Sequence, residues 1–167
     1  MLDLAKAQQF VDSYGRASAA NDPQGLAGHY AEPFRAFTLG HSGGFETRAA
    51  ALAQLVPWMG RFKEYGLDDI RFVGTELVPV SGTFCLCHIT IEVRPKDGKP
   101  AFRFTNVYGL RQDANGQRFE FSVADNETAA LVERYPDFMQ GQSASNSRSS
   151  SLRAKRSNPE PEAVRLG

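Results

Sequence analysis

The chain has 167 residues, and its 19 lysines and arginines balance 19 aspartates and glutamates. This zero net charge gives no electrostatic footprint for nucleic acid, and no apolar run approaches the roughly 20 residues of a membrane span. Cys85 and Cys87 are the only cysteines, too close together for a structural disulfide and too few for zinc. We therefore expect a reduced, cytoplasmic protein, and the helical pattern from Met1 onward does not have a signal peptide's layout.

The composition predicts one folded domain, residues 1–140. From residue 141 to residue 167, serine, asparagine, arginine and proline dominate. Such a segment buries too little apolar surface to offset its ordering entropy, so we predict a disordered tail.

Three helices are predicted in the first half of the chain. Residues 3–20 carry apolar side chains at helical spacing. Asp22 followed by Pro23 is typical of a helix start, and a short second helix is expected there. After a short strand at 34–38 and a glycine-rich loop at 40–44, a third helix is expected at 46–64, with Pro57 bending it.

Four longer strands are predicted near residues 68–80, 83–95, 100–112 and 117–125. Three pairs of turn residues separate them: Ser81-Gly82, Asp97-Gly98 and Asn115-Gly116. A two-residue turn fixes the register of a hairpin, and the register decides which side chains face the core. The predicted fold class is therefore α+β: a curved antiparallel sheet, one short and four long strands, packed against three N-terminal helices.

This register predicts the inner face of the sheet. The Asp97-Gly98 turn pairs Ile89 with Asn106 and Cys87 with Tyr108, and Asn115-Gly116 pairs Asn106 with Asp125. The apolar residues predicted to face inward are Ile70, Phe72, Val78, Ile89, Ile91, Val93, Phe102, Phe104, Leu110, Phe119, Phe121 and Val123. Five polar or reactive residues interrupt this face: Glu76, Cys87, Asn106, Tyr108 and Asp125. Because buried polar groups are costly unless paired, they indicate a pocket.

Each candidate also has a plain structural interpretation. Asp125 either caps a following short helix or acts as a pocket acid/base, and Glu76 either pairs with an arginine at the edge or enters the pocket. Tyr108 and Tyr14 are either packed core residues or hydrogen-bond donors to a ligand. The only tryptophan, Trp58, is either an anchor or part of the pocket mouth.

The outer face of the sheet is predicted to be unusually apolar. It includes Val73, Leu77, Leu86, Val107 and Ala124, and no helix is left to cover it. A homodimer that packs sheet on sheet would bury this face.

The order of elements resembles the nuclear transport factor 2-like superfamily over about residues 3–135. The segments that carry the resemblance are 10–14, 21–30 and 102–108, and the first two are similar to ketosteroid-isomerase-like and polyketide-cyclase-like members. The resemblance implies a conical fold that encloses a pocket, often in a dimer. It also implies that Tyr14 matches a helix-one tyrosine of the isomerases, whose general base lies near the first strand, where 37–40 offers no acid. A cyclase-like activity would recruit Asp125 or Glu76.

We therefore predict a cone that binds a small apolar molecule and needs no cofactor and no metal. The expected chemistry is acid/base catalysis (isomerisation, cyclisation or dehydration), with Asp125 as the proton-transfer group and Tyr108 or Tyr14 as the donor to an oxyanion. The alternative is a non-catalytic ligand-binding or dimerising interaction domain. The residues expected to line the pocket are Phe34, Phe37, Trp58, Met59, Glu76, Cys87, Phe104 and Asn106.

Overall fold

The computed structural model describes residues 1–140, so the predicted tail at 141–167 lies outside the described residues. The elements follow one another as α1 (Leu4–Ala19), α2 (Pro23–Ala27), β1 (Tyr30–Thr38), β2 (His41–Phe45), α3 (Arg48–Glu64), β3 (Ile70–Ser81), β4 (Phe84–Val93), β5 (Phe102–Asp113), β6 (Gly116–Val123) and α4 (Asp125–Arg134). Within residues 1–140, no helix combines the length and the apolar character that a membrane span requires.

Short polar side chains fix where the first three helices begin. The Asp3 carboxylate accepts hydrogen bonds from the backbone N–H groups of Ala5 and Lys6 at the start of α1. Asp22 caps α2 in the predicted way, accepting from the Gly25 N–H at 3.0 Å, and Pro23 occupies the first helical position. Thr47 caps α3. Each cap satisfies backbone donors that have no partner inside the helix.

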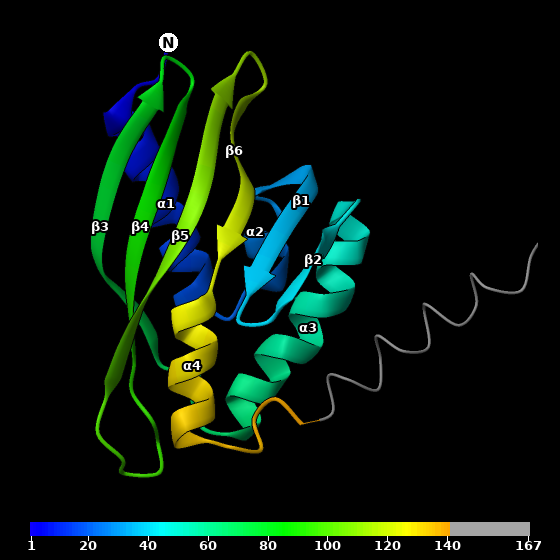
Figure 1. Ribbon diagram of the computed structural model, residues 1–167, viewed down its shortest axis with the longest axis vertical. Helices are drawn as coiled ribbons and strands as arrows, with labels where there is room; N and C mark the ends of the chain where they lie inside the picture. The colour runs from blue at the N-terminus through cyan, green and yellow to red at the C-terminus, as the bar shows by residue number, and fades with distance from the viewer. Residues whose placement is uncertain (141–167) are drawn as a thin grey trace, which may run out of the picture.

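The strands form one six-stranded sheet in the order β2-β1-β6-β5-β4-β3. Every neighbouring pair is antiparallel except β1 and β6, which are parallel. In Figure 1 the long strands β3 to β6 lie side by side, α1 runs behind them, α3 stands beside β2, and α4 follows β6 at the lower end. The α+β fold class predicted from the sequence is confirmed.

The strand β2 corrects the prediction of a loop at 40–44. A side chain at Gly44 would collide with the Phe34 carbonyl oxygen, so glycine allows β2 to pair closely with β1. Glycine is depleted in strands, so this segment carries no strand pattern.

The predicted register is confirmed for β4 and β5. Ile89 lies opposite Asn106, and Cys87 lies opposite Tyr108. The last pair of the β4–β5 ladder is Val93 with Phe102. Pro95 and Pro100 lie in the connection beyond this pair, so they remove no ladder hydrogen bond.

The predicted register of β5 and β6 is wrong by two residues next to the turn and by one residue over the inner half of β6. Asp113 pairs with Gly116, and an irregularity between Gly109 and Leu110 then places Phe121 opposite Gly109. A type I′ turn needs positive φ at both central residues, but here only Gly116 has one, at 106°. Phe119 and Ser122 are therefore the buried residues of β6, while Phe121 and Val123 lie on the outer face.

Two irregularities also change the register of β3. They lie between Phe72 and Gly74 and between Pro79 and Ser81. Between them, Leu77 pairs with Cys87 and faces inward, and Glu76 pairs with His88 on the outer face. Each β-bulge reverses the alternation of side chains, and a bulge leaves no clear sequence signature here.

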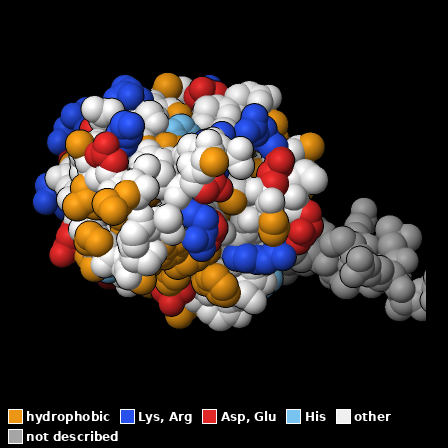
Figure 2. Space-filling view, turned by 90° about the horizontal axis from the view of Figure 1, so that it is seen from above, with side chains coloured by type: hydrophobic (Ala, Val, Ile, Leu, Met, Phe, Trp, Pro, Cys, Tyr) orange, Lys and Arg blue, Asp and Glu red, His pale blue; other side chains and the backbone are white. Residues whose placement is uncertain are grey.

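Figure 2 shows that basic, acidic and hydrophobic side chains are interspersed over the face seen from above. No single sign of charge dominates that face, in keeping with the zero net charge of the chain.

Candidate functional site

The inner face of the sheet and the helices around it enclose a cavity of about 710 Å³. This is within the usual range of small-molecule sites. Aromatic and aliphatic side chains make up most of the lining, including Phe34, Phe45, Trp58, Met59, Phe72 and Phe104. The cavity is therefore suited to a largely apolar molecule.

The helix α3 shows why the cavity remains open. Only Ala51 and Phe62 of its 17 residues are buried. Its apolar residues Leu55, Trp58 and Met59 are only partly buried and line the cavity. In a filled core these side chains would be covered, so α3 contributes one apolar wall of the cavity.

A carboxyl group and an amide lie together in the cavity lining. Glu127, in the first turn of α4, accepts a hydrogen bond from Asn106 Nδ2 on β5 at 2.6 Å. Burial raises the pKa of Glu127, and the hydrogen bond from Asn106 offsets this in part. Asn106 is 1% exposed, and its Oδ1 atom is buried without a hydrogen-bond partner. The cavity thus contains a weakened acid beside an acceptor that no group of residues 1–140 satisfies.

Three tyrosine hydroxyls form a cluster in the same lining. Tyr14 Oη lies 2.8 Å from Tyr30 Oη and 3.2 Å from Tyr108 Oη. Burial raises the pKa of Tyr14, and burial together with the charge of Glu127 raises the pKa of Tyr108 to about 12. All three groups are therefore neutral O–H donors at neutral pH. Two hydrogen bonds use two of the three hydroxyl protons, so one proton remains to donate to a ligand.

The cavity brings together seven of the residues predicted to form the site. They are Tyr14, Phe34, Trp58, Met59, Phe104, Asn106 and Tyr108. Asn106 and Tyr108 lie two positions apart on β5, so both face inward.

Asp125 is exposed and is not among the lining residues. It was expected to continue the inner face of β6, but β6 ends at Val123 and the chain is helical from Asp125 onward. The helical turn places Glu127, two positions later, on the cavity side instead.

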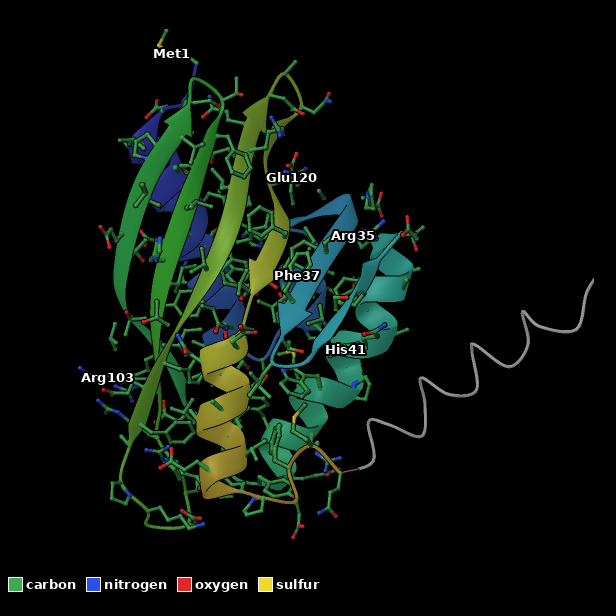
Figure 3. All side chains as sticks on the ribbon, in the orientation of Figure 1. Met1, Arg35, Phe37, His41, Arg103 and Glu120 are labelled. Atoms are coloured by element: carbon green, nitrogen blue, oxygen red, sulfur yellow. The ribbon has the colours of Figure 1, made fainter. Side chains whose placement is uncertain are left out.

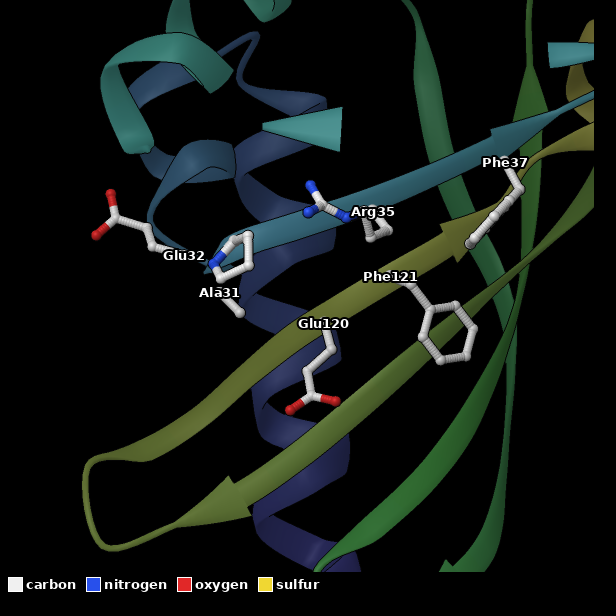
Figure 4. Close-up of a pocket in the computed structure, with 7 residues that line it drawn as sticks. Ala31, Glu32, Arg35, Phe37, Glu120 and Phe121 are labelled. Carbon is white, nitrogen blue, oxygen red and sulfur yellow. The ribbon is translucent and has the colours of Figure 1, made fainter. Parts of the chain in front are cut away.

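Three further predicted residues lie elsewhere. Glu76 is exposed on the outer face because of the bulges in β3. Phe37 is 42% exposed and lines, with Phe121, a shallow outer hollow of about 440 Å³ (Figure 4). Cys87 is fully buried, does not line the cavity and has its sulfur 3.9 Å from that of Cys85, and burial raises the pKa of its thiol.

Sequence reasoning missed Glu127 and Tyr30 as site residues. Tyr30 opens β1 and lines the cavity from there. The available signal for Glu127 was its place in the first turn of a helix that follows the last strand, opposite Asn106, which needs a partner when buried. His41, which begins β2 and is labelled near α3 in Figure 3, also lines the cavity.

Within residues 1–140, no group of three or more histidine, cysteine, aspartate or glutamate side chains is arranged to hold a metal ion.

Solved structures support the fold. A domain of unknown function with a cystatin-like fold from Nostoc punctiforme superposes with a TM-score of 0.59 at 13% identity, covering 92% of this chain and 98% of that one. A candidate scytalone dehydratase from Novosphingobium aromaticivorans gives a TM-score of 0.53 at 14% identity, with coverages of 72% and 80%. A candidate calcium/calmodulin-dependent protein kinase II association domain from Xanthomonas campestris gives 0.54 at 11% identity, with coverages of 74% and 88%. At these identities the likeness shows the fold alone.

No curated protein matches the sequence. A family described as NTF2-like protein (DUF6841) matches residues 5–127, which include every polar residue of the carboxyl–amide pair and of the tyrosine cluster. The chain therefore belongs to this NTF2-like family.

Proposed function

We propose that this protein binds a small, largely apolar carbonyl compound in the cavity and catalyses a cofactor-free proton transfer on it. Isomerisation, cyclisation and dehydration all require such a step. In this proposal Glu127 takes the role that the sequence suggested for Asp125, and the tyrosine cluster holds the substrate oxygen.

The observation that carries the proposal is the Glu127–Asn106 pair in the apolar cavity. A general acid/base is most efficient when its pKa lies near the working pH, and burial moves the pKa of Glu127 in that direction. The ionised carboxylate would remove a proton from the substrate, and the protonated carboxyl would return it at another atom. Asn106 Nδ2 holds the carboxyl in place through either step.

The tyrosine cluster supplies the second requirement. Removing a proton next to a carbonyl places negative charge on the carbonyl oxygen, and a fixed donor in a dry site stabilises that charge. The one free hydroxyl proton of Tyr14, Tyr30 and Tyr108 meets this need. The other two hydroxyl groups orient the donor.

A specific observation also favours a second function, non-catalytic ligand binding. The three hydroxyls already bond to one another, and burial raises rather than lowers the pKa of Tyr14. A binding protein would use the same cavity, and Glu127 would then only hydrogen-bond to its ligand.

Proton exchange separates the two functions without knowledge of the natural substrate. The protein is incubated with 2-tetralone, an aromatic ketone with acidic α-hydrogens, in deuterium oxide, and deuterium incorporation is followed by mass spectrometry. We expect wild type to accelerate exchange and Glu127→Gln to slow it by about 100-fold or more, because general-base catalysis contributes about 10²–10⁴-fold. The matched control is Asp125→Asn, an exposed carboxylate on the same helix, which should exchange like wild type. Exchange by wild type no faster than in buffer, or equal loss in both variants, would contradict catalysis by Glu127.

The proposal includes a homodimer that forms through the outer face of the sheet. Phe37, Val73 and Val78 are 42%, 44% and 37% exposed there, and a solved relative of this fold is named an association domain. We expect sedimentation velocity to give about twice the 18.4 kDa chain mass and Val78→Glu to give the monomer. A monomeric wild type at micromolar concentration would rule this interface out.

A further inference from the structure

Arg61 is a cation in the wall of the cavity that is only partly satisfied. It lies in the last turn of α3 and lines the same cavity as Glu127. Its Nη2 donates to the carbonyl oxygens of Asp137 and Gln140, at 2.8 and 2.5 Å. Its Nε is buried and has no hydrogen-bond partner among residues 1–140, and no carboxylate of these residues lies within ion-pair distance of the guanidinium.

The groups around Arg61 fix the position of the guanidinium but do not neutralise its positive charge. Its central carbon lies 5.8 Å from the ring centre of Tyr65 and 5.5 Å from that of Phe138. Two carbonyl oxygens and two aromatic rings fix the orientation of the group, but none of them carries a negative charge. An anion in the cavity beside the guanidinium would supply the negative charge that these partners lack.

The cation and the acid lie near opposite ends of α4. Glu127 is in the first turn of α4, and Arg61 binds the segment that follows the last turn of that helix, which ends at Arg134. At 1.5 Å per residue, the helix separates the two groups by on the order of 10 Å. Trp58, Met59 and Phe104 are apolar residues of the same lining.

From this geometry we propose that the ligand is an elongated apolar molecule with an anionic group, such as a carboxylate, that binds Arg61. Its other end carries a hydroxyl or carbonyl that reaches the tyrosine cluster and the Glu127–Asn106 pair. Asn106 Nδ2 holds the Glu127 carboxyl in place for that contact. The inference rests on the proposed function only in using the same cavity, and it names the class of molecule that this cavity takes.

Two ligands of equal shape test the charge requirement. 6-Hydroxy-2-naphthoate carries a hydroxyl and a carboxylate at opposite ends of a flat aromatic frame, and 6-hydroxy-2-naphthamide replaces only the carboxylate by a neutral amide. Isothermal titration calorimetry on the full chain measures both affinities. A charge-assisted hydrogen bond exceeds a neutral one by enough to favour the carboxylate about tenfold or more. Arg61→Gln should abolish this preference while the amide retains its wild-type affinity.

The control variant is Lys63→Gln, which removes the same charge from an exposed position of the same helical turn. It should keep the tenfold preference, because Lys63 does not line the cavity. Equal affinity of wild type for the two ligands would overturn the proposal, as would the absence of binding by either. A parallel loss of both affinities in Arg61→Gln would also overturn it, because it would show that Arg61 only supports the C-terminal segment.

The binding preference and the proton exchange are measured independently, so the role of Arg61 and the role of Glu127 can fail separately. Glu127→Gln should keep the preference for the carboxylate ligand whether or not it stops proton exchange. If wild type prefers the carboxylate ligand but does not accelerate proton exchange, the protein binds carboxylates without catalysing proton transfer. If wild type accelerates proton exchange but binds both ligands equally, the protein is an enzyme whose ligand is neutral.

Discussion

Phe138 packs the last described segment of the chain against α3. Its ring is 0% exposed and meets Trp58, Phe62 and Tyr65 edge to face, with ring centres 5.3, 5.1 and 5.2 Å apart. The next residue, Met139, lines the cavity. Replacing Phe138 by alanine therefore tests whether the folded unit extends past α4, as the predicted boundary at residue 140 requires.

The size of the effect follows from the burial of the ring. Truncating a fully buried phenylalanine costs about 3–5 kcal/mol, and the three aromatic contacts are part of that cost. Because the segment lies near the end of the described chain and can relax, we expect a loss of about 3 kcal/mol in the free energy of unfolding. With a urea slope of about 1–3 kcal/mol per molar, the midpoint should fall by roughly 1–3 M.

Urea unfolding of the full chain measures this loss, with Trp58 fluorescence and far-ultraviolet circular dichroism as two probes. The dichroism signal is needed because Trp58 contacts the mutated ring. Leu39→Ala, at a turn residue that is 61% exposed, is the control and should change the free energy of unfolding by no more than about 0.5 kcal/mol. A loss below about 1 kcal/mol in Phe138→Ala would refute the docking of this segment.

Two further predictions concern the sheet and the acid. In Gly109→Ala the new methyl group would collide with the Phe121 ring, so we expect a loss of about 1–3 kcal/mol in urea unfolding, and a neutral result would contradict the register of β5 and β6. Burial raises the pKa of Glu127 above its ordinary 4.5, so the stability from its protonated carboxyl is complete below that value and is lost as the pH rises through the native pKa. Glu127→Gln cannot lose this contribution, so its stability relative to wild type should increase from pH 4 to pH 8 in thermal unfolding, and a constant difference would argue against a buried acid.

The turns and the strand pattern predicted the centre of the sheet but not its edges. The Asp97-Gly98 turn predicted the pairing of β4 with β5, and this pairing correctly places Asn106 and Tyr108 on the inner face. The neighbouring hairpins contain bulges, and a bulge shifts every later residue to the opposite face. The residues that were therefore assigned to the wrong side are Glu76, Val78, Phe121 and Val123.

The same shift explains which carboxylate enters the cavity. The sequence extended β6 to residue 125, so strand alternation pointed Asp125 inward. In the structure the strand ends two residues earlier, and the helical turn that follows presents Glu127 to Asn106. The need of a buried Asn106 for a polar partner was predictable, but the identity of the partner depended on where the strand gave way to the helix.

The pattern of α3 was ambiguous for a different physical reason. A helix face that lines a cavity and one that packs in a core use the same apolar residues, so spacing alone does not distinguish the two. The distinction appears only in three dimensions, where Leu55 and Met59 border about 710 Å³ of space. Arg61 lies on this wall one turn after Trp58, and its charge is the feature that a purely packed helix would not need. An apolar wall with one unneutralised cation at its end describes a site for an amphipathic anion better than it describes a core.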